Sequence, residues 1–217
     1  MPMQAKKKKR IIVTVAVLGA VTVLLVAMEL TQRYFLREPD TTRPLIYQTG
    51  TSKPVYLEEP DPDFDIFDDP DWLDEDRLIH YFDGSEGTVI TWERNEAGMV
   101  GVLFLRYFDA LMKGDCEAYN ALFTQNYFAD READDYFTMQ RVYNISVTKT
   151  QEYTFTEGQY AGLTRYLFTV EYCIMRNDGT FRDDIPSDFS CPMIFELISN
   201  GETVQINGIE RVIQAGI

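Results

Sequence analysis

Acidic side chains are the residues of this chain whose spacing comes nearest to a chemical site. Residues 61–76 read DPDFDIFDDPDWLDED, and counted from Asp61 the acids occupy positions 1, 3 and 5 of a calcium-binding EF-hand loop. Position 6 is Ile66, where the sharp turn of that loop needs glycine, and position 12 is Trp72, where it needs a bidentate glutamate. The pattern therefore does not favour calcium, and no metal or cofactor is predicted.

Two other interpretations of this acidic stretch stay open. Residues 58–76 hold eleven acids and no base, and like charges repel and extend a chain. Together with six prolines, this predicts an acidic linker or stalk over residues 31–94. The acids also alternate with Phe64, Phe67 and Trp72, and such alternation occurs in segments that dock on a partner or fold back onto their own domain. These three aromatic residues are the docking candidates.

Residue types that serve other chemistries are sparse or badly spaced. The one histidine, His80, falls in the predicted linker. The sequence has no glycine-rich phosphate loop, no cluster of His and Cys at metal-ligand spacing and no nucleophile elbow. The net charge of −15 also argues against nucleic acid as a partner, because phosphates would be repelled.

The amino-terminal end has the pattern of a membrane anchor. Residues 1–10 end in KKKKR, and the 18 residues Ile11–Met28 carry no charge. As a helix they span about 27 Å, close to the hydrocarbon thickness of a bilayer. We therefore expect a cytoplasmic tail over 1–10, a single transmembrane helix over 11–30 and the rest outside the plasma membrane. The alternative is a cleaved signal peptide, which is disfavoured because Met28, Glu29 and Leu30 stand where cleavage needs small residues.

From residue 95 onward the hydrophobic period indicates an α+β domain, residues 95–217. Steps of three and four predict a helix that Asn95 caps and Gly114 ends, a short helix over 116–123 and a third helix over 125–139. The period then becomes two, which predicts strands over 141–155, 163–175, 189–199 and 202–213. Two to three helices should pack on a curved antiparallel sheet of about four strands.

This order of elements, together with RYFDALMKGDCEAYNALFT at residues 106–124, resembles the nuclear transport factor 2-like superfamily, also called the cystatin-like α+β cone. The resemblance implies a pocket between the sheet and the helices. It leaves the function open, because this fold carries both enzymes and non-catalytic modules. A similar layout, with a membrane helix before such a domain, occurs in the inner-membrane scaffold proteins of type IV secretion machines.

Ketosteroid isomerases of this superfamily give the pocket candidates. Tyr107 resembles their first-helix tyrosine by its place in RYFDAL, and the position of their base falls at Arg131, beside Asp130. An arginine cannot abstract a proton, and no strand aspartate corresponds to their second acid. The pocket candidates implied by the resemblance are Tyr107, Phe104, Phe108 and Asp130, and no catalytic residue is predicted.

The three cysteines are Cys116, Cys173 and Cys191. Cys173 and Cys191 lie in consecutive predicted strands, symmetric about residue 182. In an antiparallel hairpin of that register they would face each other within disulfide range, and an outer location would permit the bond. The alternative is two buried free thiols. Cys116 is expected to be free.

Taken together, these patterns predict a non-catalytic interaction or scaffold domain of the cell envelope, anchored in the membrane by one helix and binding a protein partner. The alternative is a small-ligand-binding domain for apolar molecules, or an isomerase-like enzyme, that uses the cone pocket.

Overall fold

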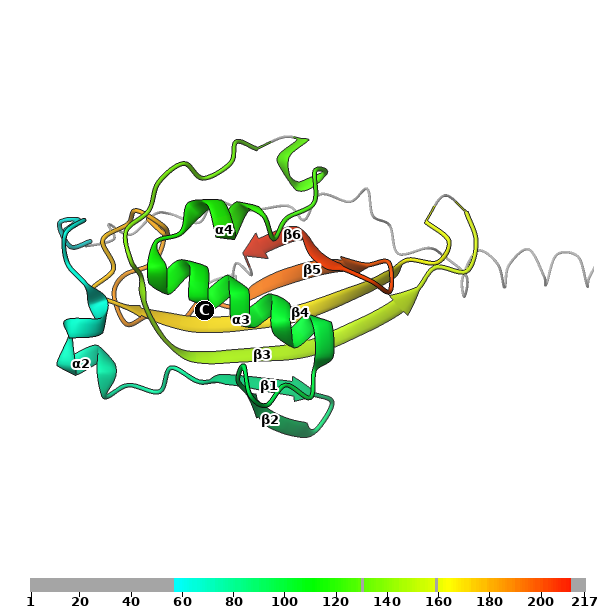
Figure 1. The fold of residues 1–217 in the computed structure, drawn as a ribbon, viewed down its shortest axis with the longest axis horizontal. Helices are drawn as coiled ribbons and strands as arrows, with labels where there is room; N and C mark the ends of the chain where they lie inside the picture. Colours follow the sequence, from blue (N-terminus) through cyan, green and yellow to red (C-terminus); the bar gives the residue numbers. More distant parts are fainter. Residues whose placement is uncertain (1–56, 130, 159, 212–217) are drawn as a thin grey trace, which may run out of the picture. The chain divides into compact units, whose positions relative to one another are not determined.

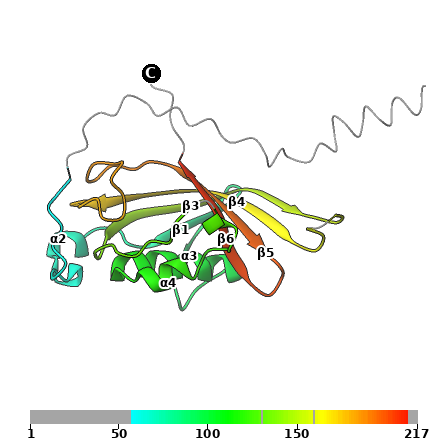
Figure 2. The same ribbon diagram turned by 90° about the horizontal axis from the view of Figure 1, so that it is seen from above.

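The structure is a computed structural model that describes residues 57–129, 131–158 and 160–211. The predicted tail and membrane helix, residues 1–30, lie outside this range. Within the described part, no helix has the length and apolar character needed to cross a bilayer. The described residues form an α+β unit in which helices α3 and α4 lie on one face of a six-stranded sheet (Figures 1 and 2). The predicted fold class is confirmed at this level.

The sheet is larger than predicted and is mixed. Four consecutive antiparallel strands are present as expected: β3 (Arg141–Thr154), β4 (Thr164–Met175), β5 (Met193–Ser199) and β6 (Val204–Arg211). Two further strands, β1 (Ile79–Asp83) and β2 (Glu86–Ile90), form a hairpin. Strand β1 pairs with β3 in parallel, which gives the order β2-β1-β3-β4-β5-β6.

The first predicted helix is α3 (Gly98–Lys113), which buries one face against the sheet. Gly114 ends it in the left-handed conformation, and the amide groups of Gly114 and Asp115 donate to carbonyls of the last turn. The predicted Asn95 cap is wrong. The helix starts after Ala97 without a side-chain cap, and the Asn95 amide instead donates to the carbonyl of Gly98.

The second helix, α4 (Cys116–Asn120), starts as predicted, because the Asp115 carboxylate accepts from the amide of Ala118. The third predicted helix is absent from the described part of residues 125–139, which contains a single 3-10 turn, Tyr127–Ala129. Tertiary contacts override helix propensity here. Phe137 and Thr138 are buried against the rest of the domain, and the Gln140 amide donates to the carbonyl of Leu111.

The predicted stalk is wrong for the part of residues 31–94 that the structure describes. Residues 66–90 form a 3-10 turn (Ile66–Asp68), helix α2 (Pro70–Leu73), β1 and β2. Ile66 and Trp72 are 1% and 0% exposed and form a second core with Tyr143 and Cys173. The Trp72 indole also donates to the carbonyl of Val142 at 3.0 Å. The acidic stretch has folded back onto its own domain.

Charge neutralisation makes this docking possible. The Asp69 carboxylate is 2% exposed and lies 2.8 Å from Nε of Arg141 and 3.0 Å from Nη1 of Arg176. It also caps α2 by accepting from the amides of Asp71 and Trp72. Two arginines and two amides thus replace the water that this carboxylate leaves on burial. Asp71 adds an ion pair to Arg176.

The predicted disulfide is not formed, since all three cysteines are free. Strand β4 pairs with β5 in the register Val170↔Met193, which is also the last pair of that ladder. Continued further, this register would place Cys173 opposite Ser190 and not opposite Cys191. A shift of one residue moves a side chain to the other face of a sheet. Accordingly Cys173 packs in the core around Trp72, whereas Cys191 packs against the main core.

Replacement of Trp72 by alanine should destabilise the domain strongly, because it removes a fully buried indole and its hydrogen bond. We expect a loss of about 3–5 kcal/mol in the free energy of unfolding, measured with a chemical denaturant. The matched control is Phe67→Ala in the same segment. Phe67 is 45% exposed and touches Trp72 only edge-on, so its loss should cost no more than about 1 kcal/mol. Equal effects of the two variants would contradict this packing.

Candidate functional site

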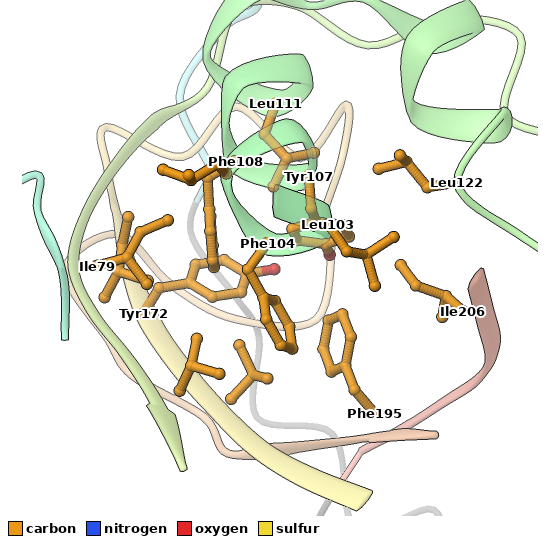
Figure 3. Close-up of a cluster of buried hydrophobic side chains, with 14 of the residues drawn as sticks. Ile79, Leu103, Phe104, Tyr107, Phe108, Leu111, Leu122, Tyr172, Phe195 and Ile206 are labelled. Atoms are coloured by element: carbon orange, nitrogen blue, oxygen red, sulfur yellow. The ribbon is translucent and has the colours of Figure 1, made fainter. Parts of the chain in front are cut away.

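The pocket that the family resemblance implies is filled by side chains. Phe104, Tyr107 and Phe108 are all at most 1% exposed and point from α3 into the sheet (Figure 3). The Tyr107 ring stands edge-on to Phe195, with 5.2 Å between centroids, and Phe108 packs in the same way on Tyr172. Asp130, the fourth pocket candidate, lies outside the described residues.

The surroundings of Tyr107 suit a core residue better than an acid catalyst. Burial, and then the nearby hydroxyls of Tyr172 and Tyr119, raise the pKa of Tyr107 well above its ordinary value. The hydroxyl therefore stays neutral. The buried arginine near it, Arg182, is held by both oxygens of Asp184, at 3.0 and 2.7 Å, so that this carboxylate is already paired.

The three docking candidates do not form one exposed face. Trp72 is fully buried, and Phe64 is half-buried beneath the guanidinium of Arg141, whose central carbon lies 4.4 Å from the ring centroid. Only Phe67 offers much of its ring to solvent. The aromatic residues of the acidic stretch therefore serve mainly to attach it to the domain.

A small hollow of about 240 Å³ lies between this stretch and the start of β3. Its lining carries both signs of charge, with Arg141 and Arg176 facing Glu58, Glu59 and Asp178. Asp178 accepts hydrogen bonds from the hydroxyl of Thr138 and from the amide and hydroxyl of Thr180. Burial opposes ionisation of Asp178, but these bonds outweigh it and lower its pKa. The hollow is thus part of the clamp that holds the stretch in place.

A larger groove, about 460 Å³, lies at the other end of the sheet. There the β3–β4 hairpin runs on past the start of α3 and leaves its concave face uncovered (Figure 1). We call this the open-end groove. It is lined by residues of β1 to β4 and by the start of α3: Tyr81, Asp83, Glu86, Gly87, Thr88, Glu96, Ala97, Val100, Lys149, Glu152 and Tyr166.

Acidic groups dominate the rim of the open-end groove. Asp83, Glu86, Glu96 and Glu152 face one base, Lys149. The ammonium group of Lys149 pairs with Asp83 and, at 3.0 Å, with Glu152. The hydrogen bond that Lys149 donates to Asp83 raises the pKa of Lys149 above its ordinary value in spite of burial, and the bond that it donates to Glu152 adds to this effect. Its charge is therefore neutralised within the groove, and an excess of negative charge remains.

The floor of the open-end groove is aromatic. Tyr81 of β1 and Tyr166 of β4 lie on either side of the buried Phe168, with centroid separations of 6.0 and 6.3 Å. Burial raises the pKa of both tyrosine hydroxyls, so they are neutral at physiological pH. An aromatic floor beneath a carboxylate rim is an arrangement that suits an organic cation.

The open-end groove was not predicted, because five of its eleven lining residues fall in the stretch assigned to the linker. One signal was present. Gly84-Ser85 separates two short segments rich in aromatic and β-branched residues, 79–82 and 88–90, which is consistent with a two-residue hairpin. In the structure, Asp83 pairs with Glu86 across that turn, and Gly84 has φ +66°.

Metal ligation and similarity give no further assignment. Among the residues that the structure describes, no group of three or more His, Cys, Asp or Glu side chains is placed to hold a metal ion. Comparisons of the chain with protein-family models, with curated proteins and with solved structures produced no match. The case for a function therefore depends on the geometry of this chain alone.

Stability should depend on pH through Asp178. Because its folded-state pKa is depressed, it stabilises the fold above its unfolded value of about 3.9, and that contribution disappears as pH falls through the folded value. We expect Asp178→Asn to lower the melting temperature at neutral pH, and to show a smaller further decrease below about pH 4 than the parent chain. The control is Asp183→Asn, which removes an exposed acid on the same loop and should leave the melting temperature at neutral pH close to that of the parent chain.

Proposed function

We propose that this protein is a non-catalytic interaction or scaffold protein of the cell envelope, anchored by the helix predicted at residues 11–30. The domain beyond it faces outward and binds a protein partner. The filled interior is the observation that carries the proposal. Phe104, Tyr107 and Phe108 occupy the place where an isomerase-like cone would admit substrate, and each is sealed by aromatic neighbours.

The distribution of charge supports a binding role for the surface. Residues 57–217 contain 32 of the 35 acids but only 11 of the 20 lysines and arginines, which gives a net charge of −21. The basic residues 6–10 stand at the opposite end of the predicted membrane helix. A strong charge of one sign attracts partners of the other sign and increases their association rate. It repels nucleic acids and anionic lipid headgroups alike.

The order of elements fits the proposed resemblance to the nuclear transport factor 2-like superfamily from α3 onward, where two helices precede four antiparallel strands. The β1–β2 hairpin and the acidic stretch stand before them. The hairpin adds two strands to one edge of the sheet, and the acidic stretch covers one end of the sheet. Both add surface without opening the interior. This architecture favours a scaffold over an enzyme.

Topology is the first test. A Ser52→Cys variant should react with a membrane-impermeant maleimide in intact cells, because the KKKKR cluster holds the amino terminus inside. The matched control, Gln4→Cys, should react only after lysis. The parent chain, with its three native cysteines, sets the background. Labelling of Ser52→Cys only after lysis would overturn the orientation and the envelope function with it.

Partner capture is the second test. The full chain is expressed in its native membrane with a photoreactive amino acid at one exposed position at a time. Variants with neighbouring positions labelled should crosslink reproducibly to one and the same partner protein. Crosslinks scattered among abundant envelope proteins, with no position dependence, would count against a scaffold role.

A further inference from the structure

We propose that the open-end groove is the partner-binding site, and that it receives the lysine or arginine side chains of an extended segment of a partner protein. This inference rests on the proposed interaction function and adds the place and the chemistry of contact. Four observations support it: the negative charge of the groove, its aromatic floor, its exposure to solvent, and the repulsion between acids at its rim.

The charge of the groove has one sign after internal pairing. Lys149 is shared by Asp83 and Glu152, which leaves the equivalent of three negative charges among the four carboxylates. Glu96 has a partner in Arg94, but both side chains are more than 60% exposed, and such surface pairs contribute little. An incoming cation can therefore compete for Glu86 and Glu96 without displacing Lys149 from its own ion pairs.

The floor suits the body of a basic side chain. Lysine and arginine carry a hydrocarbon stem beneath the charge and prefer to lay it on an apolar surface. Tyr166 and Ala97, together with the buried Tyr81 and Val100, supply such a surface, and the half-buried Tyr166 ring can also attract the cation. A small organic cation would use the same rings but would gain nothing from the backbone on either side.

The groove is accessible from solvent. The side chains of Asp83, Glu152 and Glu96 are 56%, 47% and 61% exposed, in contrast to the fully buried rings under α3. Strand β2 is the outermost strand of the sheet on this side, so an extended segment can run beside it. The main chain of a partner then lies along the groove, and its basic side chains project into the floor.

Two acids at the rim of the groove repel each other and lower the stability of the β1–β2 hairpin. Asp83 and Glu86 are direct cross-strand partners on either side of a two-residue turn, and like charges in such positions destabilise a hairpin. The same rim carries Glu96 and Glu152. Lys149 pairs with Asp83 and offsets part of this repulsion. The rim acids that remain are better explained by a ligand than by folding.

The direct test measures the binding of a blocked octapeptide of alternating lysine and alanine, carrying a neutral fluorophore, to the full chain in non-ionic detergent. Fluorescence anisotropy at about 0.15 M salt reports affinity, since long-range attraction is largely screened there. The same peptide with glutamine in place of lysine is the negative control. A photoreactive version, digested after irradiation, locates the contact by mass spectrometry.

Two pairs of variants separate the groove from the general negative charge. Glu86→Gln/Glu96→Gln removes two rim carboxylates, and Glu157→Gln/Glu202→Gln removes two exposed carboxylates elsewhere. Tyr166→Leu removes a floor ring. Its control is Tyr153→Leu, which removes an exposed ring from the other face of the same hairpin. Tyr153 lies opposite Arg165 in the β3–β4 ladder. We expect about a fivefold loss of affinity or more for each groove variant and less than a twofold change for each control.

Equal losses in the groove and control variants, or crosslinks outside residues 81–100 and 149–166, would overturn the site. Binding of lysine amide as tight as that of the octapeptide would overturn a protein segment as the occupant. These outcomes are distinct from failure of the proposed function. If capture in membranes identifies one partner but Glu86→Gln/Glu96→Gln does not weaken its crosslinking, the groove assignment fails and the scaffold function stands.

Discussion

A mismatch in length between one helix and the strands beneath it determines the layout of the domain. Helix α3 has 16 residues and is about 24 Å long, whereas β3 has 14 residues and spans about 46 Å. The apolar face of α3 can therefore cover only the middle of the sheet. The structure differs at the two ends of the sheet that α3 leaves uncovered.

At one end, the acidic stretch covers the sheet through Ile66 and Trp72. Its acids have local structural uses: Asp61, Asp65 and Asp69 each accept a hydrogen bond from the amide two residues later, and Asp65 and Asp69 cap the short helical turns that follow them. At the other end no segment of the described chain covers the strands, and acids and tyrosines line an open surface. The same residue types thus stabilise the fold in one place and destabilise a hairpin in the other.

The parts that the sequence predicted are those determined by near neighbours. The apolar spacing of α3, its glycine end and the Asp115 cap all act within a few residues, as do the alternating side chains of β3 to β6. The errors concern distant partners. Asp69 finds Arg141 and Arg176 at separations of 72 and 107 residues, and no local pattern shows that its charge will be neutralised. The disulfide prediction failed for a similar reason, because a bond between Cys173 and Cys191 depends on a strand register known to within one residue.

The parallel pairing of β1 with β3 has a mechanical consequence. Within the described residues, the chain passes through the Trp72 core before it reaches β1. Tension applied through the amino-terminal side must first extract an indole and separate Asp69 from its arginines. Only then does it load the hydrogen bonds between β1 and β3. Under a load from this side, the Trp72 core and the Asp69 ion pairs therefore stand in series before the sheet and its open groove.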